Sequence, residues 1–222
     1  MPFSREHTLK YYATDKELAD DIVKAYGMVI NDLYEAGCRN IKLDDCTWEM
    51  MADKSGHLAY GTTQSGLIEI QKAHKDINNK VIANAPKDIV INTHVCRGNF
   101  HSTYANSGAY DPVADILFGE ENVNAYYLEF DDERSGGFEP LAHVNGDKKV
   151  VLGLITTKSP KLENKADVIA RIKESQKYIS LDRLCLSPQC GFASCEIGNK
   201  LTEEEQWAKL QLVKEIAEEV WR

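Results

Sequence analysis

Four residues far apart in this chain of 222 residues carry side chains that commonly bind transition metals: His94, Cys96, Glu129 and Cys190. Each closes a stretch whose apolar, β-branched and aromatic residues are typical of a β-strand. An imidazole, a carboxylate and two thiolates together form a donor set that suits Zn²⁺. Only a fold that gathers the ends of separate strands could unite them at one zinc ion.

The spacing of His94 and Cys96 is compatible with a shared metal. Side chains alternate between the two faces of a strand, so residues two apart point the same way. A catalytic zinc keeps an exchangeable position, and we expect the Glu129 carboxylate to be the ligand that substrate displaces. The alternative interpretation is that the cysteines are small apolar core residues. No Cys-x-x-Cys pair is present to indicate a zinc ribbon or finger.

The composition indicates one globular domain spanning residues 1–222, with 43% hydrophobic and 27% charged residues. A formal net charge of -9 argues against nonspecific binding to nucleic acid or to an anionic membrane surface, because both would repel it. The first residues contain no apolar run typical of a signal peptide, and no later segment has membrane-spanning length. We therefore expect a cytoplasmic protein whose six cysteines are reduced.

Strand-like and helix-like segments alternate along the chain. Thr14 and Thr202 each begin a capping-box pattern that predicts the start of a helix, and Gly37 is placed to end the first one. Trp48 to Met51 forms a further short segment between the first strand and the second helix. The predicted helices cover residues 15–36, 65–79, 111–118, 163–179 and 203–221, and the predicted strands cover 39–44, 88–96, 123–129, 149–155 and 183–190.

This alternation predicts an α/β fold with a parallel sheet. In a (β/α) barrel of TIM type, catalytic residues come from the carboxyl ends of several strands. Such a barrel is therefore our prediction; a doubly wound sheet is the rival, although it usually gathers ligands at one switch point. No glycine-rich phosphate loop is present, so nucleotide binding is not indicated. The polar residues at the predicted strand ends are Asp44, His94, Cys96, Glu129, Lys158 and Cys190.

Three segments together resemble the cobalamin-independent methionine synthase family, in particular its short single-domain members. Residues 92–100 are similar to that family's His-x-Cys zinc strand, residues 128–129 to its glutamate ligand, and residues 187–192 to its last cysteine ligand. The resemblance covers nearly the whole chain. It implies the carboxyl-terminal portion of a methionine synthase-like barrel, with about five of the eight βα units of the fold.

The resemblance also implies an activity. In this family, zinc bound by His94, Cys96, Glu129 and Cys190 would activate the thiol of homocysteine, which takes a methyl group to give methionine. Asp44 lies in a segment similar to the family's Asp-Glu strand end, whose aspartate binds the amino group of homocysteine. The alternative for Asp44 is a helix-capping aspartate.

Lys158 departs from the family pattern. In the long family members a histidine at this place protonates the leaving amine of the donor, whereas residues 156–160 offer Lys158 as the acid. A lysine of ordinary pKa is a weaker acid than histidine near neutral pH. The methyl donor is therefore open between methyltetrahydropteroyltriglutamate, a corrinoid-bound methyl group and another small donor. The alternative for Lys158 is a solvated loop lysine.

Two further functions compete with homocysteine methylation. One is zinc-dependent alkylation of another thiol, such as one of the coenzyme M type, which would not need Asp44. The other is a zinc-binding fragment that is inactive alone or active only with a partner. We also expect self-association, because the predicted edge strands, 39–44 and 183–187, read as apolar and the missing barrel units would leave them open.

Overall fold

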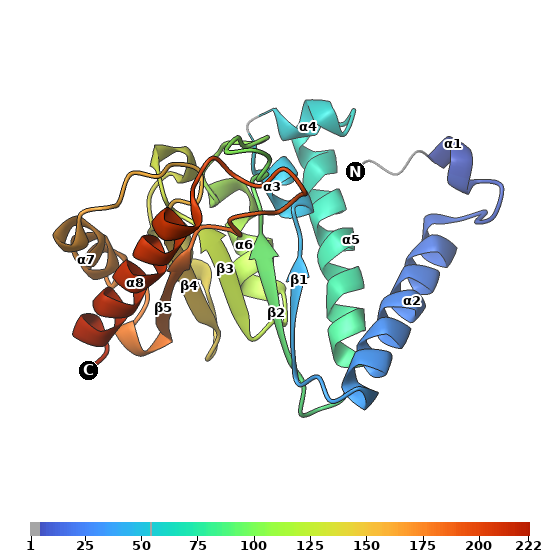
Figure 1. Cartoon of the computed structure of the whole chain (residues 1–222). Coiled ribbons are helices and arrows are strands. Elements are labelled where there is room, and N and C mark those ends of the chain that lie inside the picture. Colours follow the sequence, from blue (N-terminus) through green and yellow to red (C-terminus); the bar gives the residue numbers. More distant parts are fainter. Residues whose placement is uncertain (1–4, 54) are drawn as a thin grey trace.

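The computed structural model describes residues 5–53 and 55–222, and its centre is a parallel β-sheet of five strands (Figure 1). Long crossovers join the strands, as parallel pairing requires. Each contains at least one α-helix except the one between β3 and β4, which contains two short 3-10 helices, Glu133–Ser135 and Glu139–His143. The strands are β1 (Asn40–Asp44), β2 (Val90–Val95), β3 (Ala125–Glu129), β4 (Lys149–Ile155) and β5 (Leu184–Pro188).

Four of the helices, α2, α5, α7 and α8, begin at a residue whose side chain caps them. Thr14 and Thr202 both form capping boxes, in which the threonine hydroxyl accepts from the backbone N–H three residues later. Gly37, at a φ of 97°, ends the first long helix in the left-handed conformation that glycine adopts without strain. The helices are α1 (Arg5–Thr8), α2 (Asp15–Glu35), α3 (Thr47–Ala52), α4 (Gly56–Ala59), α5 (Gln64–Ala83), α6 (Asp111–Glu120), α7 (Lys165–Ser175) and α8 (Glu203–Val220).

The strand order identifies the kind of sheet. The strands lie side by side in the order β1-β2-β3-β4-β5, and every pair is parallel. A doubly wound sheet reverses its strand order at a switch point, whereas consecutive order is that of a (β/α) barrel wall. The prediction of a barrel of TIM type, represented by five strands, is therefore confirmed.

The two faces of the sheet have different roles. Tyr126, Leu128, Val150 and Leu152 are fully buried in the main apolar core between strands and helices. Gly153 allows β3, β4 and β5 to approach closely, because a Cβ there would lie 2.7 Å from the Gln189 Cα and 2.8 Å from the Leu128 oxygen. The opposite face, which lines the inside of the barrel wall, carries polar side chains such as His94 and Glu129 together with the apolar Val151.

Some predicted boundaries were wrong. The helix predicted for residues 65–79 continues to Ala83, and the one predicted for 163–179 spans only Lys165–Ser175. The later start has a local cause, because the Asn164 side chain accepts from the N–H groups of Ala166 and Asp167 and so caps the helix there.

The expectation of two apolar edges also needs correction. In β1 the exposed positions are Asn40, Lys42 and Asp44, whereas Ile41 and Leu43 pack against the helices. β5 is an apolar strand, but α8 lies against it and its side chains are at least half buried. The exposed face of the β1 edge is therefore polar.

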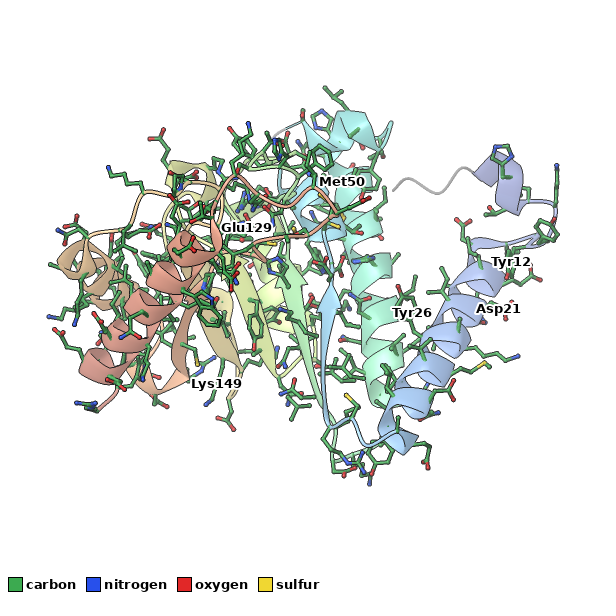
Figure 2. All side chains as sticks on the ribbon, viewed as in Figure 1. Tyr12, Asp21, Tyr26, Met50, Glu129 and Lys149 are labelled. Atoms are coloured by element: carbon green, nitrogen blue, oxygen red, sulfur yellow. The ribbon has the colours of Figure 1, made fainter. Side chains whose placement is uncertain are left out.

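The α2 helix packs on α5 at the β1 end of the sheet (Figure 1). Its Val23 and Ile30 are buried there, but the helix also carries an exposed apolar row, Tyr26, Val29 and Leu33, at helical spacing. Figure 2 labels Tyr26 on this helix. Across residues 5–53 and 55–222, no helix combines the length and apolar character needed to cross a membrane.

Candidate metal centre

The four metal-binding residue types predicted from the sequence meet at the carboxyl ends of three strands. Glu129 ends β3, whereas Lys149 begins β4 at the opposite end of the sheet (Figure 2). One donor atom from each of the four residues lies within 4.8 Å of the others. The structure thus places His94, Cys96, Glu129 and Cys190 around one point.

His94 presents one ring nitrogen to this point. Its Nδ1 lies 3.1 Å from the backbone oxygen of Tyr127, to which a protonated Nδ1 would donate. Its Nε2 is buried and has no hydrogen-bond partner within the described residues. A hydrogen bond from one nitrogen to a backbone carbonyl is the usual way in which a metal-binding histidine is oriented.

The two cysteines lie close enough to share a proton or an ion. The Sγ atoms of Cys96 and Cys190 are 3.9 Å apart. A hydrogen bond from the Cys96 thiol, helped by the neighbouring His94 ring, lowers the pKa of Cys190, and the same contact raises the pKa of Cys96. At least one thiolate is therefore favoured here, and thiolate is the form that binds metal.

Glu129 is buried, and its two carboxylate oxygens differ. Oε1 accepts from the backbone N–H of Arg97 at 2.9 Å, whereas Oε2 has no partner within the described residues. Burial raises the pKa of Glu129, while the Arg97 N–H, the Lys158 ammonium and the His94 ring oppose that rise. The carboxylate thus offers one free oxygen toward the two sulfurs and the imidazole.

This donor set fits zinc. Burying a polar atom without a partner is unfavourable, yet the His94 Nε2 and the Glu129 Oε2 are both left in this state. A cation bound among the four side chains would satisfy both atoms. Two sulfurs, one nitrogen and one oxygen agree with the tetrahedral N, O and S coordination of zinc.

Asp44 and Lys158 lie beside this cluster and not in it. Asp44 is opposite His94 in the register of β1 and β2, so the two side chains project from the same face of the sheet. Asp44 is exposed, and in the structure it does not cap α3, which has no side-chain cap. Lys158 is half buried. Its Nζ donates to Asn99 Oδ1 at 3.2 Å, and this hydrogen bond holds the side chain in place.

Two asparagines that the sequence analysis gave no role connect the loops around the cluster. Asn99 donates to the Gly191 oxygen and to the Ser194 hydroxyl, both at 2.6 Å. Asn199 donates to Asn99 Oδ1 at 2.9 Å and to the Thr157 oxygen at 2.8 Å. These contacts join the loops that follow β2, β4 and β5. Loop asparagines have no spacing pattern that would have predicted this.

A second missed feature is a fully buried ion pair behind the cluster. The guanidinium of Arg97 contacts the Glu49 carboxylate, and neither side chain is exposed. Burial raises the pKa of Glu49, and the charge of Arg97 opposes this rise and favours the carboxylate. Arg97 directly follows Cys96, so the only sequence signal was a charged residue inside an apolar strand end.

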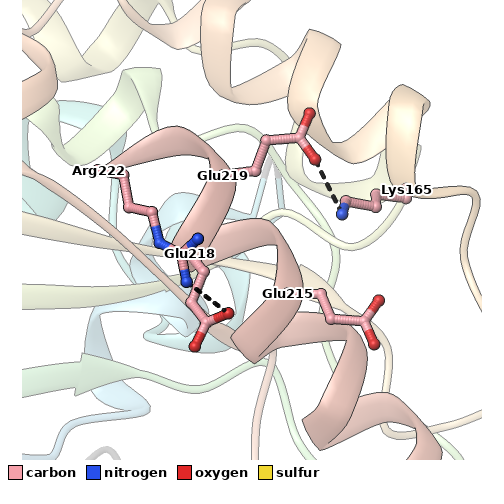
Figure 3. A pocket seen from close by; sticks show the side chains of 5 residues that line it. All are labelled: Lys165, Glu215, Glu218, Glu219 and Arg222. Atoms are coloured by element: carbon pink, nitrogen blue, oxygen red, sulfur yellow. Dashed lines mark ion pairs between the residues drawn. The ribbon is translucent and has the colours of Figure 1, made fainter.

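Two surface hollows lie elsewhere on the described residues. One, of about 490 Å³, is lined by Phe100, Cys195, Glu196 and Ile197. The other, of about 400 Å³, lies on α7 and α8 (Figure 3). Its charges are partly paired, Lys165 with Glu219 at 2.8 Å and Arg222 with Glu218 at 3.1 Å. Neither hollow contains a residue of the four-residue cluster.

Sequence comparison identifies relatives over almost the whole chain. The model of a family described as cobalamin-independent synthase, catalytic domain, matches residues 10–219. The uncharacterized protein YxjG of Bacillus subtilis is 48% identical over 95% of this chain and 56% of its own length. A methionine synthase of Saccharolobus islandicus is 23% identical over 96% of this chain and 55% of its own length.

Solved structures agree with this assignment. A putative vitamin-B12 independent methionine synthase from Listeria monocytogenes is 34% identical, with a TM-score of 0.74 over 97% of this chain and 62% of that chain. A B12-independent methionine synthase from Shewanella sp. W3-18-1, in complex with selenomethionine, shares the fold, with a TM-score of 0.69 at 20% identity over 95% of this chain and 56% of that chain. The chain spans a little over half the length of the Bacillus subtilis and Saccharolobus islandicus proteins.

Proposed function

Because this chain belongs to the family of cobalamin-independent synthase catalytic domains, we propose that it binds zinc and transfers a methyl group to the thiol of homocysteine, giving methionine. In this proposal the metal ligands are His94, Cys96, Glu129 and Cys190. We further propose that residues 1–222 form a single catalytic-type domain, the carboxyl-terminal portion of a methionine synthase-like barrel, which acts on small molecules in the cytoplasm. All six cysteines are free of disulfides, which agrees with a reducing compartment.

One observation carries the proposal: four donor atoms converge within 4.8 Å, and two of these atoms, His94 Nε2 and Glu129 Oε2, are buried without a hydrogen-bond partner among residues 5–53 and 55–222. A site of packed, inert cysteines would not need a buried imidazole nitrogen and carboxylate oxygen beside them. Zinc bound there would act as a Lewis acid that lowers the pKa of a substrate thiol.

The chain's own residues then account for substrate binding and proton supply. Asp44, exposed on the same face as His94, would bind the ammonium group of homocysteine through a charge-assisted hydrogen bond. Glu129 would release its Oε2 when the thiol arrives, since its Oε1 keeps the bond from Arg97. Lys158, fixed by Asn99, would hold a proton at Nζ for the leaving group of the methyl donor.

Lys158 also offers a way to identify the methyl donor. A donor whose leaving group is an amine, such as methyltetrahydropteroyltriglutamate, requires protonation and so requires Lys158. A corrinoid-bound methyl group leaves without a proton at this position. Loss of transfer on Lys158→Ala with the first donor but not with the second would identify the lysine as the acid.

The test combines metal content with methyl transfer. Purified protein should contain about one zinc ion per chain, and Cys96→Ala and Cys190→Ala should lose most of it. Cys195→Ala is the matched control, because Cys195 lies five residues from Cys190 but outside the cluster. Wild-type metal content in both ligand variants would refute the site.

The acceptor is tested with paired thiols. Asp44→Asn should weaken methylation of homocysteine and leave methylation of a thiol without an amino group, such as coenzyme M, unchanged. Zinc binding without methylation of either thiol would favour the second candidate, a zinc-binding chain that requires a partner. Methylation of coenzyme M alone would favour an alkyltransferase with another acceptor.

A further inference from the structure

Tyr110 lies directly behind the Glu129 end of β3. It precedes α6, is fully buried, and packs its ring against Phe118 and Phe130, with centroids 5.9 Å and 5.3 Å away. Its hydroxyl contacts both backbone polar groups of Glu129, accepting from the N–H at 3.1 Å and donating to the oxygen at 3.3 Å. A single side chain therefore satisfies the backbone of Glu129 on one side.

The strand pairing explains why Glu129 needs such a partner. In parallel sheets, successive residues direct their N–H and C=O groups to opposite neighbours. The next residue, Phe130, donates to the Gly153 oxygen of β4 at 2.9 Å, so the Glu129 groups face the β2 side. There the pairing of β2 with β3 ends at Val95 and Leu128. The Tyr110 hydroxyl takes the place of the missing strand partner.

Arg97 supports the same residue from two directions. Its backbone N–H binds Glu129 Oε1, and its guanidinium lies 4.5 Å from the centroid of the Tyr110 ring. The guanidinium also contacts the Glu49 carboxylate and the Gly108 oxygen. Burying an ion pair removes the hydration of both charges, and this cost offsets most of the attraction between them, so the pair adds little net stability to the fold. Its placement behind the cluster indicates a positioning role.

We propose that Tyr110 and Arg97 are positioning residues that hold Glu129 as a ligand through one oxygen. Tyr110 fixes the backbone, the Arg97 N–H occupies Oε1, and only Oε2 is left for the metal. This inference rests on the proposed function, because it requires that the cluster binds a metal. The inference goes beyond the proposed function because it states that Tyr110 and Arg97, which touch neither metal nor substrate, determine how Glu129 binds the metal.

The test is Tyr110→Phe, which removes one hydroxyl and keeps the ring. Tyr126→Phe is the matched control: Tyr126 is also fully buried, packs on Phe118 at 5.1 Å, and donates to the backbone oxygens of Leu117 and Glu121. Both variants lose a buried hydroxyl in the same core, but only Tyr110 contacts a residue of the cluster. Zinc affinity is measured by competition with a chelator, and Co²⁺ absorption reports the ligand geometry.

We expect Tyr110→Phe to weaken zinc binding by about 10- to 100-fold and to shift the Co²⁺ spectrum, whereas Tyr126→Phe leaves both unchanged. If Tyr110→Phe folds only with metal, its rate of zinc release into excess chelator should exceed that of the control. Equal affinities or equal release rates for the two variants would overturn the inference alone. A wild-type protein that binds no zinc would overturn the proposed function, and the inference with it.

Discussion

Glu121 is a buried carboxylate at the junction of α6 and β3, far from solvent. Its Oε1 accepts from the Asn78 side chain at 2.6 Å, and Asn78 also donates to Asp45 at 3.0 Å. His74 lies 2.8 Å from the same Asp45 oxygen. The Glu121 Oε2 has no hydrogen-bond partner within the described residues. Burial raises the pKa of Glu121 from 4.5 to about 7. We predict that this carboxyl group makes stability fall as pH rises.

The sign and size follow from proton linkage. An acid whose folded pKa is raised takes up a proton on folding, so its stabilising contribution is complete below the unfolded pKa and is lost as pH rises toward the folded pKa. The relevant window is therefore between 4.5 and about 7. A shift of this size corresponds to about 3 kcal/mol. Glu121→Gln replaces the carboxyl with a neutral amide of similar shape and should remove this pH dependence.

The assay is urea denaturation of the wild type and of Glu121→Gln at about pH 5 and about pH 8. Relative to the wild type, the variant should gain about 2 to 3 kcal/mol between the two pH values. Although burial opposes it, the hydrogen bond to Asp45 raises the pKa of His74, so His74 also stabilises more at low pH. That contribution is present in both proteins and should largely cancel.

Glu120→Gln is the control, because Glu120 is a neighbouring, half-exposed carboxylate paired with Lys75 at 2.9 Å. Loss of a surface ion pair should change stability by less than about 1 kcal/mol and without a comparable trend with pH. Parallel pH profiles for the wild type and Glu121→Gln would refute the reasoning. They would show that Glu121 is already ionised in the folded protein or reaches water.

Four further outcomes are expected. Gly98→Ala should destabilise the fold by about 1 to 3 kcal/mol and lower the zinc content, because φ at Gly98 is 94° and a Cβ there would lie 2.7 Å from the Ala105 nitrogen. The melting temperature and a metal analysis of the variant would measure these two effects. Arg97→Met should cost about 3 to 5 kcal/mol in urea denaturation by leaving Glu49 buried and unpaired, and a second change, Glu49→Leu, should restore most of it. Homocysteine, but not homoserine, should release a proton on binding, which calorimetry in buffers of different ionisation enthalpy would count; equal release would argue against thiol activation. The exposed apolar row on α2 should cause the protein to self-associate, which sedimentation would detect. A stable monomer at micromolar concentration would contradict this prediction.

Much of the secondary structure follows from local sequence. Capping boxes at Thr14 and Thr202 placed the starts of the two helices they cap, because a threonine hydroxyl satisfies backbone N–H groups within its own turn. The apolar strand stretches and the His94-x-Cys96 spacing likewise depend only on the two-residue period of a strand. The strands, the alternation with helices and the four candidate ligands could therefore be read from the sequence.

Tertiary structure decided what surrounds those ligands. Tyr110 reaches Glu129 because the pairing of β2 with β3 ends at Val95 and Leu128, and strand pairing is a contact between distant segments. Arg97 contacts Glu49, which lies 48 positions away in the sequence. Arginine and glutamate are usually exposed, so neither residue type predicts burial. Local sequence patterns describe only residues that are neighbours along the chain. The Oε2 of Glu129 is free because a distant residue, Arg97, binds Oε1 and no other described group reaches Oε2, and only the tertiary structure shows this.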